Sequence, residues 1–274
     1  MTDVLAEQKR YYAARAGEYD DWWFRRGRYA LAPHEQERWD ADVEEAEAAL
    51  AAFAPQGSVL DEQKRYYAAR AGEYDDWWFR RGRYALAPDE QARWDADAAE
   101  AEAALAAFAP QGSVLELAAG TGLWTRHLAR TAERLVAVDA NDETLAINRG
   151  RVEGEVEYVR ADLFSWQPEE RFDVCFFSFW LSHVPEELFD AFWRLVRSAL
   201  RPGGRVFLVD SAGGERGRSA GSEHERRQLS DGREYRIVKR YWSPETLAAR
   251  VRPLGFELDL RVTANHHFLV GGGA

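Results

Sequence analysis

The sequence predicts a three-layer α/β/α domain around a mostly parallel sheet, preceded by a helical region that occurs twice. Short apolar segments alternate with helical segments from residue 113 onward, as in successive β-α-β units whose strands are buried on both faces. A glycine-rich turn follows the first apolar segment, and the Pro202–Gly204 turn precedes the fifth. This alternation is typical of a sheet that binds its ligand at the carboxyl ends of the strands.

Seven strands and four intervening helices are expected. The predicted strands are Ser113–Leu117, Arg134–Asp139, Val156–Arg160, Asp173–Ser178, Gly204–Asp210, Tyr235–Tyr241 and Glu257–Leu269. The predicted helices are Trp124–Thr131, Asp142–Arg149, Glu186–Leu200 and Pro244–Leu254. Because the last two strands come late and close together, we expect an antiparallel strand at one edge of the sheet.

The helical region is duplicated, since residues 7–60 (copy one) recur as residues 62–115 (copy two) with four differences in 54 positions. The shared Val-Leu dipeptide at the junction indicates a recent tandem duplication. An assembly artefact would leave a similar seam, although four differences argue against simple copying. Only copy two continues past a first half-strand into the glycine-rich turn, whereas copy one stops at Gly57–Leu60. We therefore expect a duplicated segment 1–60, a helical lid 61–112 and a core 113–274, with residues 1–60 dispensable.

Composition narrows the class of function. The net charge is −11, so the basic footprint of a nucleic-acid-binding protein is missing and no nucleic-acid partner is expected. No apolar run approaches the roughly 18 residues of a membrane span, and the first residues lack the apolar segment of a secretory signal. The single cysteine, Cys175, cannot form an internal disulfide, which fits a reducing cytoplasm.

The strongest motif is the segment Val114-Leu-Glu-Leu-Ala-Ala-Gly-Thr-Gly122, where a strand leads into a glycine-rich turn and a helix opens at Leu123. Glycine lets a backbone approach a ligand, and a helix N-terminus offers free N–H groups. A dinucleotide site needs a third glycine three residues after Gly122, but Thr125 stands there. The motif therefore disfavours a dehydrogenase.

With Asp139 after the second strand and Asp162 after the third, this motif resembles the E-x-x-x-G-x-G loop of class I S-adenosylmethionine (SAM)-dependent methyltransferases. The resemblance covers about residues 62–274 and departs from the common pattern at Ala118-Ala119, where the side chains are still small. It implies a Rossmann-like domain with a seven-stranded sheet and an antiparallel edge strand. It also implies SAM as the cofactor and S-adenosylhomocysteine (SAH) as the product.

The resemblance assigns the ribose hydroxyls to Asp139 and the adenine amino group to Asp162. The full set of cofactor residues that it implies is Tyr67, Glu116, Ala118, Gly120, Thr121, Gly122, Asp139, Ala140, Asp162, Leu163, Ser178 and His183. His183 is also the candidate general base, because imidazole titrates near neutral pH. Proximity and orientation without a base are the alternative.

Acceptor contacts are predicted for Tyr74, Trp180 and Arg233. Acidity and aromatic content favour a small-molecule acceptor whose oxygen, nitrogen or carbon attacks the methyl group in line. The arginines between residues 226 and 240 keep a peptide or protein carboxylate as an alternative, beside a SAM-binding protein without turnover. His266 and His267 would point to opposite faces of a strand, so no metal is expected. Copy one could form a homodimer as a swapped lid.

Overall fold

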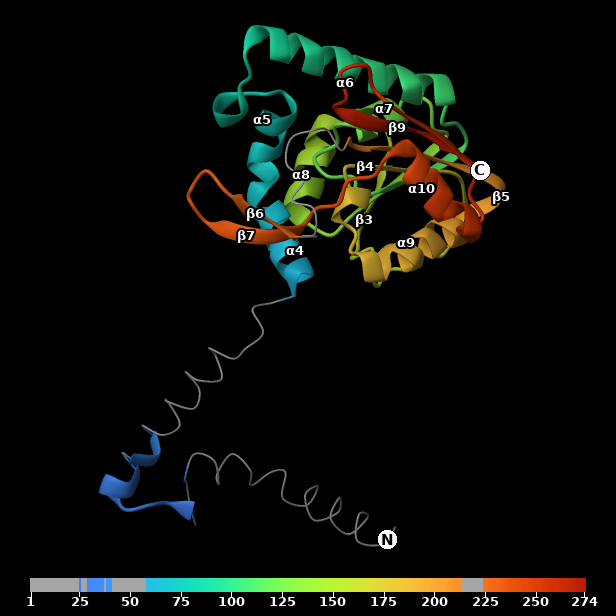
Figure 1. Ribbon diagram of the computed structural model, residues 1–274. Coiled ribbons are helices and arrows are strands. Elements are labelled where there is room, and N and C mark those ends of the chain that lie inside the picture. The colour runs from blue at the N-terminus through green and yellow to red at the C-terminus, as the bar shows by residue number, and fades with distance from the viewer. Residues whose placement is uncertain (1–24, 26–28, 37, 41–57, 213–223) are drawn as a thin grey trace, which may run out of the picture. The chain divides into compact units, whose positions relative to one another are not determined.

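The computed structural model describes the chain except residues 1–24, 26–28, 37, 41–57 and 213–223 (Figure 1). The chain divides into two units, Met1–Gly57 and Ser58–Ala274. In the first unit, residues 33–36 and 38–40 are helical. The second unit carries the sheet and begins three residues before the predicted boundary at residue 61. No helix within the described ranges is long and apolar enough to cross a membrane.

A seven-stranded sheet with the order β3-β2-β1-β4-β5-β9-β8 forms the centre of the second unit (Figure 1). Five strands run parallel, and β9 runs antiparallel to both β5 and β8. The parallel strands are β1 (Ser113–Leu117), β2 (Arg134–Asp139), β3 (Glu157–Arg160), β4 (Phe172–Ser178) and β5 (Leu200–Ser211). The predicted fold class is confirmed, and the strand order reverses beside β1, where sheets of this kind bind ligands.

Two strand predictions were wrong. The expected strand Glu257–Leu269 is two strands, β8 (Leu258–Val262) and β9 (Phe268–Gly273), joined by a turn in which His266 has φ 63°. The expected strand Tyr235–Tyr241 is β7 (Glu234–Val238), which pairs with β6 (His224–Gln228) in a hairpin outside the main sheet. The glycines of β9 hid that strand because glycine has low strand propensity. A Cβ on Gly273 would lie 1.8 Å from the Glu257 carbonyl oxygen, so the packing requires glycine there.

Helices cover both faces of the sheet. Helix α6 (Pro88–Phe108) and α7 (Thr125–Leu128) share one apolar cluster with the sheet, while α9 (Glu186–Ala199) and α10 (Pro244–Val251) share another. Helix α8 (Asp142–Arg151) packs beside α7. Neighbouring residues of β4 point to opposite faces, and both faces are buried. This double burial explains why β4 reads as a continuous apolar run.

The predicted lid, residues 61–112, includes α6. The part before α6, for which we keep the name lid, consists of α4 (Val59–Arg70), η3 (Ala71–Glu73), α5 (Tyr74–Trp78) and η4 (Gly82–Tyr84). Helix α4 begins after Ser58, whose side chain accepts a hydrogen bond from the Asp61 amide. The expectation that the segment Gly57–Leu60 starts a strand was therefore wrong for Ser58–Leu60, while Gly57 lies outside the described residues. The same four residues at 112–115 lead into β1, where apolar neighbours are buried, whereas polar helix formers follow Leu60.

Asp97 of α6 fixes the turn between β8 and β9. Its carboxylate accepts hydrogen bonds from the Thr263 hydroxyl (2.8 Å), the Asn265 amide (2.9 Å) and the His267 amide (3.0 Å). Burial alone would raise the pKa of Asp97, but these hydrogen bonds lower it to about 2. The group is therefore ionised throughout the ordinary pH range.

We expect Asp97→Asn to lower the free energy of unfolding by about 2–3 kcal/mol at pH 7, because a buried charged acceptor loses partners. Since the folded pKa lies below the unfolded value, the stabilisation is present above pH ~4 and is lost as the pH falls toward 2. Urea unfolding at pH 7 and pH 3 measures both effects. Asp95→Asn, on the exposed side of the same helix, is the control; equal losses in both variants would contradict the assignment.

Candidate functional site

A cavity of about 810 Å³ lies at the carboxyl ends of β1 to β4, beside the reversal of strand order. Ten of the twelve residues predicted to hold the cofactor line it: Tyr67, Ala118, Gly120, Thr121, Asp139, Ala140, Asp162, Leu163, Ser178 and His183. The predicted acceptor residues Tyr74 and Trp180 line it as well. We call it the cofactor cavity.

Asp139 lies at the end of β2 and organises the glycine-rich turn. Its carboxylate accepts hydrogen bonds from the amides of Gly120 and Asn141 (both 2.9 Å) and from the Thr144 hydroxyl (3.0 Å). Burial raises the pKa of Asp139, and these hydrogen bonds oppose that rise. A carboxylate has about four acceptor positions, so the three in use leave room for one ligand hydroxyl.

Glu116 and Gly122 are not part of the cavity wall. Glu116 is buried in β1, and neither of its carboxyl oxygens has a hydrogen-bond partner among the described residues. Burial raises the pKa of Glu116 to about 8, so the acid is protonated at neutral pH. Gly122 has φ 86°, and a Cβ there would lie 2.6 Å from the Asn148 side-chain oxygen. Its role is the close packing of α8 against the turn.

The lid is tied to the cofactor cavity by residues that sequence analysis missed. Lys64 of α4 forms an ion pair with Asp162, with 2.6 Å between Nζ and Oδ2. Gln63 donates to the His183 carbonyl (3.2 Å) and accepts from the Val238 amide (3.0 Å). Both residues belong to a polar helix turn with no motif of its own, so only the fold brings them to the site.

A second tie joins α5 to the glycine-rich turn. Asp75 accepts a hydrogen bond from the Thr121 hydroxyl (3.0 Å) and pairs with Arg151 of α8. Arg151 also donates to the Thr121 carbonyl at 2.6 Å. Asp75 directly follows Tyr74, so this network holds the Tyr74 ring at the cavity wall.

His183 lies in η5 (Leu181–His183) and is neutral. Its Nδ1 is 2.7 Å from the Val238 carbonyl oxygen, which can only accept, so Nδ1 carries the proton. Nε2 therefore accepts from the Tyr67 hydroxyl, also at 2.7 Å. Burial, reinforced by the charge of Lys239, holds the pKa of His183 well below its usual range. Because Tyr67 occupies the free lone pair, a proton reaches His183 only if this hydrogen bond breaks or relays it.

A second cavity of about 990 Å³ adjoins the first and shares Tyr67, Tyr74, Phe179 and His183 with it. It lies between the lid and the β6–β7 hairpin, and we call it the acceptor cavity. Phe179, between the two cavities, has φ 49°, a conformation that costs free energy in a residue other than glycine and is often found at functional sites. Arg233, predicted to bind the acceptor, instead lies exposed in the hairpin turn and pairs with Asp231.

Comparison with known proteins identifies the family. A model of the methyltransferase domain family matches residues 114–204. A solved structure of DhpI in complex with SAM and HEP is 38% identical, with a TM-score of 0.66, and its alignment covers 80% of this chain and 99% of that one. The chain belongs to the class I SAM-dependent methyltransferases. DhpI in complex with SAH is also 38% identical, with a TM-score of 0.64.

Two curated relatives match shorter segments of this methyltransferase. Demethylmenaquinone methyltransferase of Clavibacter sepedonicus is 34% identical over 102 residues. Cypemycin N-terminal methyltransferase of Streptomyces sp is 36% identical over 100 residues. Each alignment spans 35% of this chain and 40% of the relative.

His266 and His267 lie in the turn between β8 and β9, and not on a strand as expected. His267 pairs with Asp97 through Nδ1 at 2.9 Å. Within the described residues, no group of three or more histidine, cysteine, aspartate or glutamate side chains could hold a metal ion.

The depressed pKa of His183 predicts a pH-dependent loss of stability. The folded state keeps His183 neutral while the unfolded chain binds a proton below pH ~6.5, so stability should fall by up to ~1.4 kcal/mol per pH unit between pH 6.5 and 5.5. Urea unfolding of His183→Asn should show a correspondingly weaker pH dependence. His266→Asn, at an exposed position, is the control. If His183→Asn keeps the full pH dependence of the parent, another group is responsible.

Proposed function

We propose that this chain transfers the methyl group of SAM to a small-molecule acceptor and releases SAH. The cofactor cavity carries the proposal, because Asp139, Asp162 and the glycine-rich turn converge there as they do in the family motif. The likeness to DhpI, solved with SAM and with SAH, supports the same cofactor.

When bound, SAM would supply an electrophilic methyl group: an acceptor oxygen, nitrogen or carbon would form a bond to the methyl carbon while the carbon–sulfur bond breaks, with SAH as the leaving group. The protein contributes position and the exclusion of water. Asp139 and Gly120 would hold the ribose side of SAM, and Asp162 would hold the adenine side. Tyr67, Tyr74 and Phe179 form an aromatic wall between the cavities, where ring faces can stabilise a sulfonium cation.

A peptide acceptor is the second candidate, favoured by the likeness to cypemycin N-terminal methyltransferase. A SAM-binding protein without turnover is the third. Labelled SAM separates the three, because transfer to small molecules, transfer to peptides and binding without product are different outcomes.

Copy one is proposed to be dispensable for SAM binding. The DhpI alignment covers nearly all of DhpI but only 80% of this chain, so about a fifth of this chain has no counterpart there. A homodimer in which copy one serves a second chain as a swapped lid is the alternative.

Asp139→Ala should weaken SAM binding by about 1.5–3 kcal/mol, because a hydrogen-bond acceptor for the ribose is lost. Calorimetric titration with SAM measures this loss, and thermal unfolding checks that the variant folds. Asp142→Ala removes an exposed acid three residues away, which pairs with Arg160, and should bind SAM as the parent does. Parental affinity in Asp139→Ala would refute the assignment of this site.

Two truncations test the role of copy one and the start of α4. A protein that begins at Ser58 behind a new Met should keep the SAM affinity of the parent to within about twofold. One that begins at Asp61 loses the Ser58 cap, which is worth about 1 kcal/mol, and the Leu60 contact with the cofactor cavity. It should melt at a lower temperature and bind SAM less tightly. Loss of SAM binding by the Ser58 protein would show that residues 1–57 belong to the site. A change of oligomeric state alone, read from the molar mass by light scattering on a sizing column, would support the swapped lid.

A further inference from the structure

We propose that the acceptor cavity binds an oxyanion, so that the acceptor carries a carboxylate or a phosphorus oxyanion. This inference rests on the proposed methyl transfer, because it concerns the acceptor half of the same site. Five cationic side chains line the cavity, and no aspartate or glutamate of the described ranges does. Such a concentration of positive charge runs against the net charge of −11 of the whole chain.

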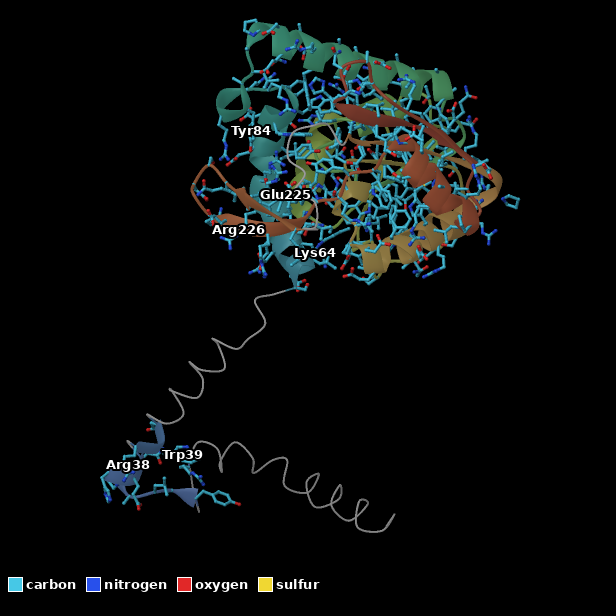
Figure 2. The ribbon with its side chains drawn as sticks, in the orientation of Figure 1. Arg38, Trp39, Lys64, Tyr84, Glu225 and Arg226 are labelled. Carbon is cyan, nitrogen blue, oxygen red and sulfur yellow. The ribbon has the colours of Figure 1, made fainter. Side chains whose placement is uncertain are left out.

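The five cations come from separate parts of the fold. Arg70 ends α4, Arg83 lies in η4, Arg226 and Arg227 lie in β6, and Lys239 follows β7. Figure 2 labels Arg226 on the hairpin and Tyr84 on the lid, on the side of the molecule where the hairpin lies against α4. Arginine and lysine at such a junction form charge-assisted hydrogen bonds with carboxylates and phosphates.

Arg70 is the strongest indication that the acceptor cavity binds an anion. Its side chain is 7% exposed, and the buried Nε has no hydrogen-bond partner. Among the described residues it forms no ion pair, and its guanidinium lies 5.2–5.7 Å from the ring centres of Tyr66, Tyr74, Trp77 and Tyr84. A buried charge without a counterion is costly, and a bound oxyanion would offset that cost.

Lys239 is the second buried cation, 9% exposed. Its ammonium donates to the hydroxyls of Ser182 (2.8 Å) and Ser211 (3.2 Å), which are neutral, and one of its three donors is left over among the described residues. The nearby carboxylates have other partners. Glu225 pairs with Arg227, and Asp210 accepts from the Ser182 amide at 2.9 Å. Burial lowers the pKa of Lys239, and the charge of Asp210 opposes this effect.

The remaining basic residues of the hairpin region have partners elsewhere. Arg236 pairs with Glu62, Arg233 pairs with Asp231, and Arg240 pairs with Glu186. Of this basic run, Arg226, Arg227 and Lys239 line the acceptor cavity, and Arg227 also pairs with Glu225. Because the cavity shares Tyr67, Tyr74, Phe179 and His183 with the cofactor cavity, an anion held by Arg70 and Lys239 places its acceptor next to the bound cofactor.

Anion titrations of the full-length protein saturated with SAH test the inference. Binding of SAH is measured first, and its absence would reject the proposed function itself. Inorganic phosphate and acetate are then titrated separately into the protein at pH 7 and constant ionic strength, and binding is detected by NMR. At least one of the two anions is expected to reach saturation, with a Kd on the order of 1 mM. Phosphate binding tighter than acetate assigns a phosphorus oxyanion, and the reverse order assigns a carboxylate. If SAH binds but neither anion does, the inference is overturned.

Arg70→Met should weaken anion binding at least ~10-fold, while SAH affinity changes by less than about twofold. Arg15→Met is the matched control, because Arg15 is the copy-one counterpart of Arg70 and residues 7–33 are identical to residues 62–88. It should bind the anion as the parent does, and an equal loss in Arg15→Met would overturn the assignment to this cavity. Lys239→Met replaces Arg70→Met if the latter fails to fold. Unchanged anion affinity in the variant that folds would also overturn the inference.

Discussion

Both cavities depend on the docking of the lid against the carboxyl edge of the sheet. This docking is polar as well as apolar. Lys64 pairs with Asp162, Gln63 bridges His183 and Val238, and Asp75 joins Thr121 to Arg151. Leaving one partner of a partly buried ion pair or hydrogen bond unsatisfied costs free energy. These contacts therefore fix the position of the lid more closely than apolar contact alone.

The two cavities differ in charge, and this difference matches the two proposed ligands. Asp139, Asp162 and Lys64 line the cofactor cavity, which therefore has no excess of positive charge, and the sulfonium of bound SAM would lie at its aromatic wall. Arginines and a lysine line the acceptor cavity, where an oxyanion would lie. Opposite charges would then meet at the aromatic wall, out of water, where Coulomb attraction is stronger than in solvent. Because His183 at this wall is neutral, it adds no positive charge that would weaken the attraction between the sulfonium and the oxyanion.

The features that the sequence predicted correctly are those that a local pattern determines. The turn at Gly120, the acid Asp139 and the parallel strands follow from spacing and apolar periodicity, because each is specified within a few residues. Context decided the rest. Ser-Val-Leu starts a helix at residues 58–60 and forms part of a strand at residues 113–115, according to whether the following residues can be buried. Lys64 and Arg70 carry no motif, and only long-range packing brings them to the cavities.

Because the two copies have nearly the same sequence, they would compete for one docking surface on the sheet. The direct connection of copy two to the sheet would decide which copy occupies it. The copy-one counterparts of the three docking residues are Gln8, Lys9 and Asp20, identical in type to Gln63, Lys64 and Asp75. If copy one replaced copy two on the sheet, it would form the same contacts that copy two gives up. The sequences of the two copies therefore give almost no preference for either one at this surface. Copy two continues directly into β1, so its effective concentration at the docking surface is high and its loop-closure cost is small. Copy one would gain the surface only where copy two is absent or already exchanged, so any swapped assembly would depend on protein concentration.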